Sequence, residues 1–288
     1  MIHEQRLPRP ATGPLSSNAL IELSLYSTTI FVFAALLVQF FLTLLTAILL
    51  RIIGYPIQPG LFSIIYLSNS NAGWSDAQVY LVFGSGPVLL FAIGLWLVGV
   101  LKRISGIHWK LRLVLTWMAF LMVNVLPCGI VAGAFFFDSF GIAFQWINGN
   151  FLARGMISVG IIMFMLFFNH FWLMLFVRAA YSQDFIQKGE HRRIFVINTV
   201  FKPLIYGFFI LLFFAWPFKS LYWPVSLFIF GYILIPTSDR LLRSPNLHVP
   251  ATDNKIFSSL FQKVLFILGL VLLWFANYTI ITSRINFF

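Results

Sequence analysis

Residues 152–177 read LARGMISVGIIMFMLFFNHFWLMLFV and decide the fold class, because they hold a single charged side chain, Arg154. About 20 apolar residues suffice for a helix to cross the hydrocarbon core of a bilayer. The whole chain of 288 residues has the same character, since 60% of it is hydrophobic and only 9% is charged. Such a composition is typical of an integral membrane protein. We therefore expect an all-α, polytopic bundle of transmembrane helices.

Six further apolar runs predict spans of the same kind. With the first run they give seven predicted helices, near residues 27–50, 78–101, 113–136, 152–177, 196–215, 221–237 and 262–282. The sixth run is the shortest, so six or seven spans are expected. Residues 1–20 are polar and predict a disordered N-terminal tail, and residues 21–288 predict one transmembrane domain with no soluble part.

The basic residues predict the orientation of the bundle. Of the 19 Lys and Arg residues, fourteen fall on the side of the N-terminus, four fall on the other side, and Lys202 lies within a span. Because short cytoplasmic loops carry the excess of Lys and Arg, the N-terminus is expected inside and the C-terminus outside. The basic side is expected to be the cytoplasm of a bacterial cell, bounded by its inner membrane, although an organelle membrane would give the same pattern.

The expected partners follow from the same distribution of charge. The formal charge is +11, but no continuous basic block occurs, so nucleic acid is not expected. The lipid bilayer is an expected partner, and the basic inner face is suited to anionic lipid headgroups. A protein partner in a membrane complex is a further possibility.

Polar side chains interrupt the apolar runs at a few positions. Asn169 and His170 come eight or nine residues before Arg178, which places His170 about 12 Å from the inner end of its helix. Lys202 reaches a similar depth in the fifth span, and Asn124 lies near the middle of the third. Ionisable groups inside a membrane often mark functional sites. Asn124, Asn169, His170 and Lys202 are therefore the candidate intramembrane polar site.

Each of these residues also has a structural explanation. Asn124, Asn169 and His170 are side chains that hydrogen-bond to neighbouring helices in many membrane proteins and fix their register. Lys202 has a stem long enough to carry its ammonium group to the inner headgroups. The structural explanations are favoured, and a metal or proton-relay role for His170 stays open.

Glycine and proline predict where the helices bend. Gly84, Gly86 and Pro87 are expected to kink or interrupt the second span, and Pro127 is expected to disturb the third. Proline lacks the backbone N–H of a regular helix, so it leaves a carbonyl without its partner. Pro203, directly after Lys202, can likewise leave a backbone carbonyl without its partner.

Two further features concern contacts at the outer side. Gly129 and Gly133 have the G-x-x-x-G spacing that lets another helix backbone approach closely. Asp138 and Arg154 flank the short loop between the third and fourth spans and are expected to form a rim pair worth at most about 1 kcal/mol.

Several enzyme classes are excluded by missing motifs. The sequence has no H-E-x-x-H, no G-x-S-x-G and no carboxylate within a predicted span, since Glu4, Glu22 and Glu190 lie outside. His170 is the only histidine in a predicted span, which excludes bis-histidine haem. Cys128 is the only cysteine, so a Cys-based metal cluster is not expected. We expect no metal and no cofactor, and lean against an enzyme.

One family resemblance can be stated. Gly86-Pro87, a basic loop, Asn124-Val-Leu-Pro127, and then Asp138 with Gly141 together resemble a degenerate core of the site-2-protease-like intramembrane metalloproteases, over residues 80–180. That family uses a His-Glu helix and a later Asp for zinc. This chain lacks the His-Glu motif, and Asp138 follows Pro127 at a different distance. The resemblance implies a related fold without protease activity.

These patterns lead to two main functional hypotheses. The leading one is a non-catalytic membrane subunit or scaffold that binds a protein or lipid partner. The alternative is a small-solute transporter or membrane enzyme with its site in the inner half of the bundle. A lipid-handling role is a third hypothesis, based on the aromatic outer loop 51–77 and on the basic inner face. The apolar patch Leu61–Leu67 of that loop is too short to span the membrane, so it should dip into the outer interface or cover the bundle.

Overall fold

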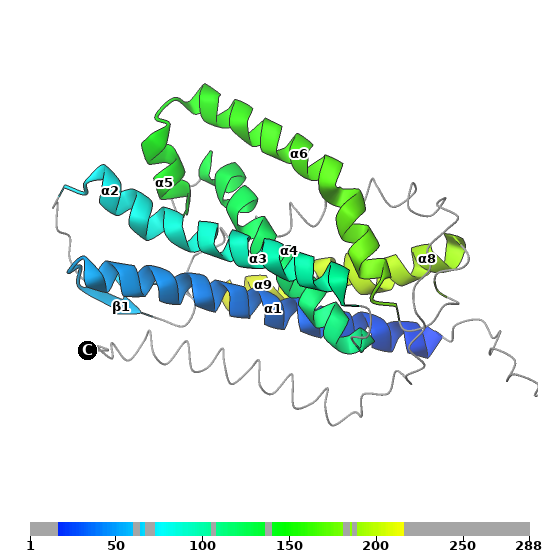
Figure 1. Cartoon of the computed structure of the whole chain (residues 1–288). Helices are drawn as coiled ribbons and strands as arrows, with labels where there is room; N and C mark the ends of the chain where they lie inside the picture. The colour runs from blue at the N-terminus through cyan, green and yellow to red at the C-terminus, as the bar shows by residue number, and fades with distance from the viewer. Residues whose placement is uncertain are drawn as a thin grey trace, which may run out of the picture.

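The fold is nearly all helical (Figure 1), and we describe it from a computed structural model. The described residues are 17–59, 64–66, 73–104, 108–135, 140–180, 185 and 189–215. The predicted spans 221–237 and 262–282 lie outside these residues, as do residues 1–16 of the predicted tail. The number of spans beyond the first five therefore stays a prediction.

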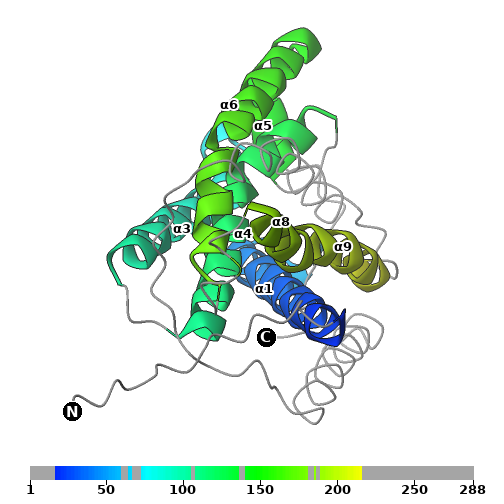
Figure 2. The same cartoon turned by 90° about the vertical axis from the view of Figure 1, so that its right-hand side faces the viewer.

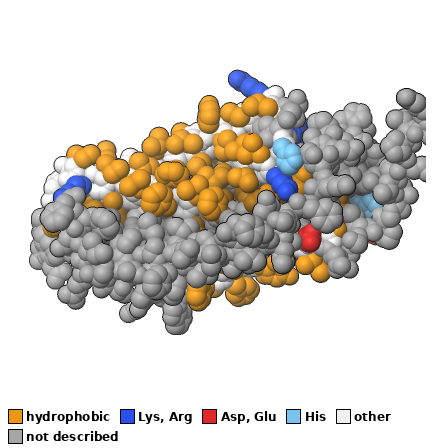
Figure 3. Space-filling view, turned by 90° about the horizontal axis from the view of Figure 1, so that it is seen from below, with side chains coloured by type: hydrophobic (Ala, Val, Ile, Leu, Met, Phe, Trp, Pro, Cys, Tyr) orange, Lys and Arg blue, Asp and Glu red, His pale blue; other side chains and the backbone are white. Residues whose placement is uncertain are grey.

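Five helical segments are long and apolar enough to cross a membrane. They are Ala19–Ile52, Asp76–Arg103, Trp109–Gly133, Phe151–Val177 and Gly189–Phe213. Each coincides with one of the first five predicted spans, so the prediction of a helical membrane protein is confirmed. Figure 3 shows one face of the molecule, on which hydrophobic side chains fill the area between Lys and Arg side chains near its ends.

Two of these five segments are built from more than one element. The first is α1 (Ser17–Ile52), the third is α4 (Trp109–Gly133) and the fourth is α6 (Phe151–Val177). The second joins α2 (Asp76–Val79), the π-helical turn η1 (Tyr80–Gly84) and α3 (Ser85–Arg103). The fifth joins α8 (Gly189–Val196), the π-helical turn η2 (Ile197–Phe201) and α9 (Lys202–Ala215). A short helix, α5 (Phe140–Ile147), lies between α4 and α6 and was not predicted.

The two π-helical turns lie just ahead of prolines. η1 ends three residues before Pro87 and η2 ends two residues before Pro203. A proline cannot donate to the carbonyl four residues earlier, and a wider turn accommodates the missing bond. The expected irregularity in the second span is therefore present as η1. α4 differs, because it stays α-helical through Pro127.

α4 is at the centre of the bundle and α6 is at its edge. α4 contacts α1, α3, α5 and α6, and 67% of its most apolar stretch is buried. In α6 the corresponding share is 11%. Figures 1 and 2 show why, since the N-terminal half of α6 stands apart from α1 and α9 in both views.

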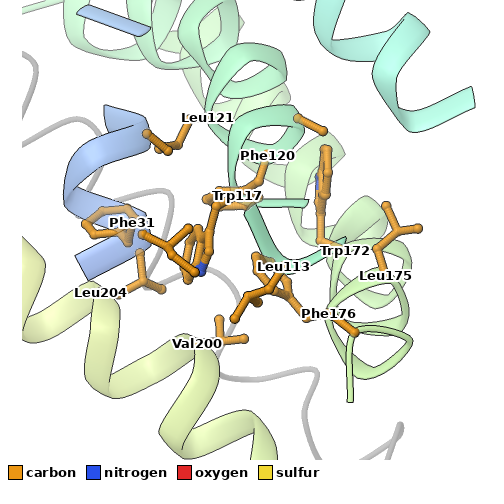
Figure 4. Packing of buried hydrophobic residues seen from close by; sticks show 14 of the residues in the cluster. Phe31, Leu113, Trp117, Phe120, Leu121, Trp172, Leu175, Phe176, Val200 and Leu204 are labelled. Atoms are coloured by element: carbon orange, nitrogen blue, oxygen red, sulfur yellow. The ribbon is translucent and has the colours of Figure 1, made fainter. Parts of the chain in front are cut away.

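The core is organised around aromatic rings of α1, α4 and α6 (Figure 4). The ring of Trp117 lies 4.9 Å from that of Phe31 and 4.6 Å from that of Phe176, between ring centroids. Phe120 contacts Trp172 edge to face at 5.3 Å. Such pairs stabilise a structure by about 0.5–1.5 kcal/mol each beyond the area that they bury. The cluster therefore fixes the three helices relative to one another.

A small ribbon lies beside the helices of this nearly all-helical fold. β1 (Ile57–Pro59) pairs antiparallel with β2 (Ile64–Tyr66), with Ile57 opposite Tyr66. Gly54, at φ +88°, turns the chain out of α1 into the ribbon. The side chain of Ile57 is buried in a cluster with residues of α1 and η1. Strand pairing was missed because the loop was judged only by its length against the bilayer.

Some helix boundaries also differ from those predicted. α1 begins at Ser17, so residues 17–20 of the expected tail are helical. Glu22 lies near the start of α1, and Glu190 and His191 lie in the first turn of α8, although all three were expected outside the spans. The prediction used the apolar runs alone. Helices extend beyond such runs because their polar first turns lie at the level of the headgroups.

Candidate functional site

Three helical segments meet at a buried polar junction. The Trp117 indole Nε1 donates a hydrogen bond to the hydroxyl of Ser27 at 3.0 Å, and that hydroxyl donates to the backbone carbonyl of Thr199 at 2.6 Å. All three residues are fully buried. Thr199 stands four residues before Pro203, which has no N–H to donate within this π-helical turn. The Ser27 hydroxyl donates to the Thr199 carbonyl and thereby joins α1 and α4 to η2.

Two more polar residues lie beside this junction. The Lys202 ammonium Nζ donates to the Asn198 side-chain oxygen Oδ1 at 2.8 Å, and the Asn198 amide nitrogen donates to the Ile194 carbonyl at 2.7 Å. Asn198 is buried and Lys202 is half-buried. The lysine side chain therefore reaches back toward the basic end of its helix, the direction that snorkelling would require. Its ammonium is held by an amide of the same helical segment.

Asn124 and Asn169 lie at the same level of the antiparallel pair α4 and α6. On one side of this level Phe120 contacts Trp172, and on the other side Cys128 and Met165 belong to one buried cluster. The two asparagines are 0% and 2% exposed. The structure therefore places two of the four predicted site residues at the same level of the bundle.

The amide of Asn124 is only partly satisfied. Its nitrogen Nδ2 donates to the Phe120 carbonyl at 2.6 Å, within α4. Its oxygen Oδ1 is buried and accepts no hydrogen bond from the part of the chain that the structure describes. A buried acceptor in this state destabilises the fold by about 1–3 kcal/mol relative to a bonded one. Asn124 is thus the one predicted site residue with an unused polar atom in the core.

His170 lies apart from the other three predicted residues, on the surface of α6. Its side chain is exposed, although the neighbouring Asn169 is buried. Exposed side chains at intervals of three or four residues form a single stripe along α6, which we call the α6 stripe: Leu152, Met156, Val159, Met163, Phe167 and His170. The four predicted residues therefore do not converge on one cavity.

The glycines expected to support packing do lie at close contacts. A Cβ atom on Gly129 would lie 2.9 Å from the Phe140 Cβ, and one on Gly133 would lie 2.6 Å from the Gly141 Cα. Both contacts are with α5, so the G-x-x-x-G spacing of α4 accommodates this short helix. A Cβ atom on Gly86 would lie 3.0 Å from the Cδ1 of Leu42, in α1.

Four predicted positions remain, and each has different surroundings. Pro87 is buried, and nothing lies within 4 Å of a Cβ placed on Gly84. Asp138 lies outside the described residues, so its expected pair with Arg154 stays a prediction. The guanidinium carbon of Arg154 lies 5.9 Å from the centre of the Phe151 ring.

Arg112 joins the basic ends of three helices. Its guanidinium Nη1 donates to the carbonyl of Arg178 at 3.3 Å, and Nη2 donates to the carbonyl of Ile104. These carbonyls belong to the residues that end α6 and α3. Sequence reasoning counted Arg112 only as a charge that sets topology. Its burial, at 7% exposed, could not be read from a position at the edge of an apolar run.

The junction residues Ser27, Trp117, Asn198 and Thr199 were also missed by the sequence analysis. Single Ser, Thr and Asn residues in apolar runs are common, and only the pairing of distant segments distinguishes them. The one local signal was Pro203, which predicts a freed carbonyl at Thr199.

Metal ligands and known relatives give no further assignment. Within the described ranges, no group of three or more His, Cys, Asp or Glu side chains is placed to hold a metal ion. No protein-family model, curated protein or solved structure matches the chain. The geometry is therefore the basis for a functional proposal.

Proposed function

We propose that the protein is a non-catalytic membrane subunit or scaffold that binds a partner in the plane of the bilayer. The support comes first from how its inner polar groups are used. The hydroxyl of Ser27, the indole of Trp117 and the ammonium of Lys202 all bond to groups of the bundle itself. Groups used in this way hold helices together and are not directed at a substrate.

The observation that carries the proposal is the uncovered face of α6. The five apolar members of the α6 stripe are between 60% and 81% exposed. Because the rest of the helix also has little cover, α6 presents more apolar surface for a partner than the central helix α4 does. Lipid chains would cover this face equally well, which is why the test must distinguish lipid from protein.

We further propose an orientation with the N-terminus inside and the C-terminus outside, in a bacterial inner membrane. The start of α1, the end of α3, the start of α4, the end of α6 and α8 gather at one end of the molecule (Figure 1). Exposed basic residues lie at that end: Lys102, Arg103, Arg178 and Arg193. Their charge suits the anionic headgroups of the cytoplasmic leaflet.

A second candidate function is a small-solute transporter or membrane enzyme. It is favoured by one observation, the unused oxygen of Asn124 at the level of Asn169. The exposed position of His170 removes that residue from such a site. The proposed kinship with site-2-protease-like metalloproteases would place Gly86-Pro87 and Asn124 on α3 and α4, which lie side by side. We propose no protease chemistry for this chain.

Affinity purification from the native membrane in mild detergent, followed by mass spectrometry, tests the proposed function. We expect a protein partner in stoichiometric amount. Phe167→Ala should reduce its yield, whereas Phe209→Ala, at an exposed position of α9, should leave it unchanged. Recovery of single copies of the chain, with neither another protein nor a second copy bound in any mild detergent, would instead favour the transporter or enzyme.

A further inference from the structure

The exposed imidazole of His170 limits which kinds of partner can cover the α6 stripe. Among the residues that the structure describes, none is a hydrogen-bond partner of its imidazole, and the side chain is exposed. The histidine stands about 12 Å from the inner end of α6, marked by Arg178, at 1.5 Å per residue. A polar ring at that depth in hydrocarbon is unfavourable unless it is hydrogen-bonded. The stripe is therefore suited to a partner that offers a polar group at this depth.

Lipid chains do not meet this condition, but a second copy of the protein does. Two copies inserted in the same direction can meet about a two-fold axis along the membrane normal, so that their α6 helices run parallel. Each residue of the stripe then faces its own copy at the same depth. A neutral imidazole has one donor and one acceptor nitrogen, so two of them can hydrogen-bond to each other. No other group has to be supplied.

The remainder of the stripe is compatible with such a contact. Its apolar residues recur every three or four positions from Leu152 to Phe167 and so follow one side of the helix. Gly155 and Gly160 flank this side, and nothing lies within 4 Å of a Cβ placed on either. Small flanking residues let a second helix approach closely.

We propose that the α6 stripe is a symmetric dimer interface, in which the His170 side chains of two copies pair within the membrane. The proposal rests on the proposed function and names the partner at that surface. Any additional protein or lipid would then bind to this dimer.

Cysteine cross-linking in native membranes tests the geometry. Met163→Cys, in a Cys128→Ala background, should form a disulfide-linked species of two chains on oxidation. Phe209→Cys is the matched control, because Met163 and Phe209 are 62% and 63% exposed and lie at similar distances along their helices from Arg178 and Arg193. A two-chain species with Phe209→Cys alone, or with neither variant, would overturn the symmetric interface. If a different protein still co-purified, the proposed function would survive that result.

The role of His170 is tested by the monomer–dimer equilibrium in proteoliposomes, measured by energy transfer between labelled chains. His170→Leu removes both polar nitrogens and should weaken dimerisation about threefold to tenfold, the range for interhelical hydrogen bonds in membranes. His170→Asn retains a donor and an acceptor and should restore most of the affinity. An unchanged equilibrium with His170→Leu would overturn the proposed pairing.

Discussion

The hydroxyl of Ser27 donates a hydrogen bond of 2.6 Å to the carbonyl of Thr199, across 172 residues of sequence. Pro203, four residues later, has no N–H to donate within this π-helical turn. The same hydroxyl accepts a hydrogen bond from Trp117, so one serine connects three helical segments of the bundle. A polar side chain in this position serves the architecture of the bundle.

Ser27→Ala should destabilise the protein by about 1–3 kcal/mol, because it removes the hydrogen bond to the Thr199 carbonyl and leaves the Trp117 N–H buried without its partner. Equilibrium unfolding in mixed detergent micelles measures this change. Ser158→Ala is the control, since the hydroxyl of Ser158 is also buried but bonds only the Arg154 carbonyl of its own helix. Equal losses in the two variants would contradict a bridging role for Ser27.

Gly94→Ala should separate α3 from α4. A Cβ atom at this position would lie 2.8 Å from the Val123 Cγ2 and 2.9 Å from its backbone nitrogen, so the helices must move apart. Such overpacking costs about 1–3 kcal/mol, measured as a lower thermal midpoint by circular dichroism. Gly99→Ala on the same helix meets nothing within 4 Å and should be neutral or stabilising. A lower thermal midpoint for Gly99→Ala than for Gly94→Ala would show that α3 and α4 do not approach each other as described.

Arg112→Lys should lower stability by about 1–3 kcal/mol although the charge is kept. A single ammonium group cannot reproduce the fork of the guanidinium that reaches both the Arg178 and the Ile104 carbonyls. Arg103→Lys, at an exposed position of α3, should change stability by no more than about 0.5 kcal/mol. If lysine replaced both arginines equally well, Arg112 would act only as a topological charge.

Asn124→Leu should change stability by less than about 1 kcal/mol, or increase it, because the substitution removes a buried oxygen that has no partner among the described residues. Asn198→Leu should be destabilising, since it removes the acceptor of the Lys202 ammonium. Unfolding in detergent compares the two variants. A large loss with Asn124→Leu would mean that this amide has an essential partner, as the transporter or enzyme hypothesis requires.

The five described spans could be predicted because the signal is local: an apolar run is either long enough to cross the bilayer or it is not. The helix irregularities ahead of Pro87 and Pro203 also have a local sequence signal, since each proline removes a particular backbone donor. The ribbon at Ile57–Pro59 and the short helix α5 depend on contacts with other parts of the bundle. Neither segment is long enough to stand out by hydropathy.

The candidate site was harder to predict, because α6 is apolar on every side. In such a helix the sequence does not distinguish the buried Asn169 from the exposed His170, which are adjacent. Their faces are set by contacts with α4, made through Trp172 and Phe176. The inner polar junction was missed for the same reason, because its members lie in α1, α4 and η2.

The most direct test of the central claim is photo-cross-linking in native membranes, with a benzophenone amino acid in place of Phe167. This residue is the most exposed member of the α6 stripe, at 81%. A binding role for α6 predicts a discrete protein adduct, identified by mass spectrometry, which the same probe in place of Phe209 on α9 does not give. Adducts with lipid alone at Phe167, as at Phe209, would contradict the claim that this face binds a protein partner.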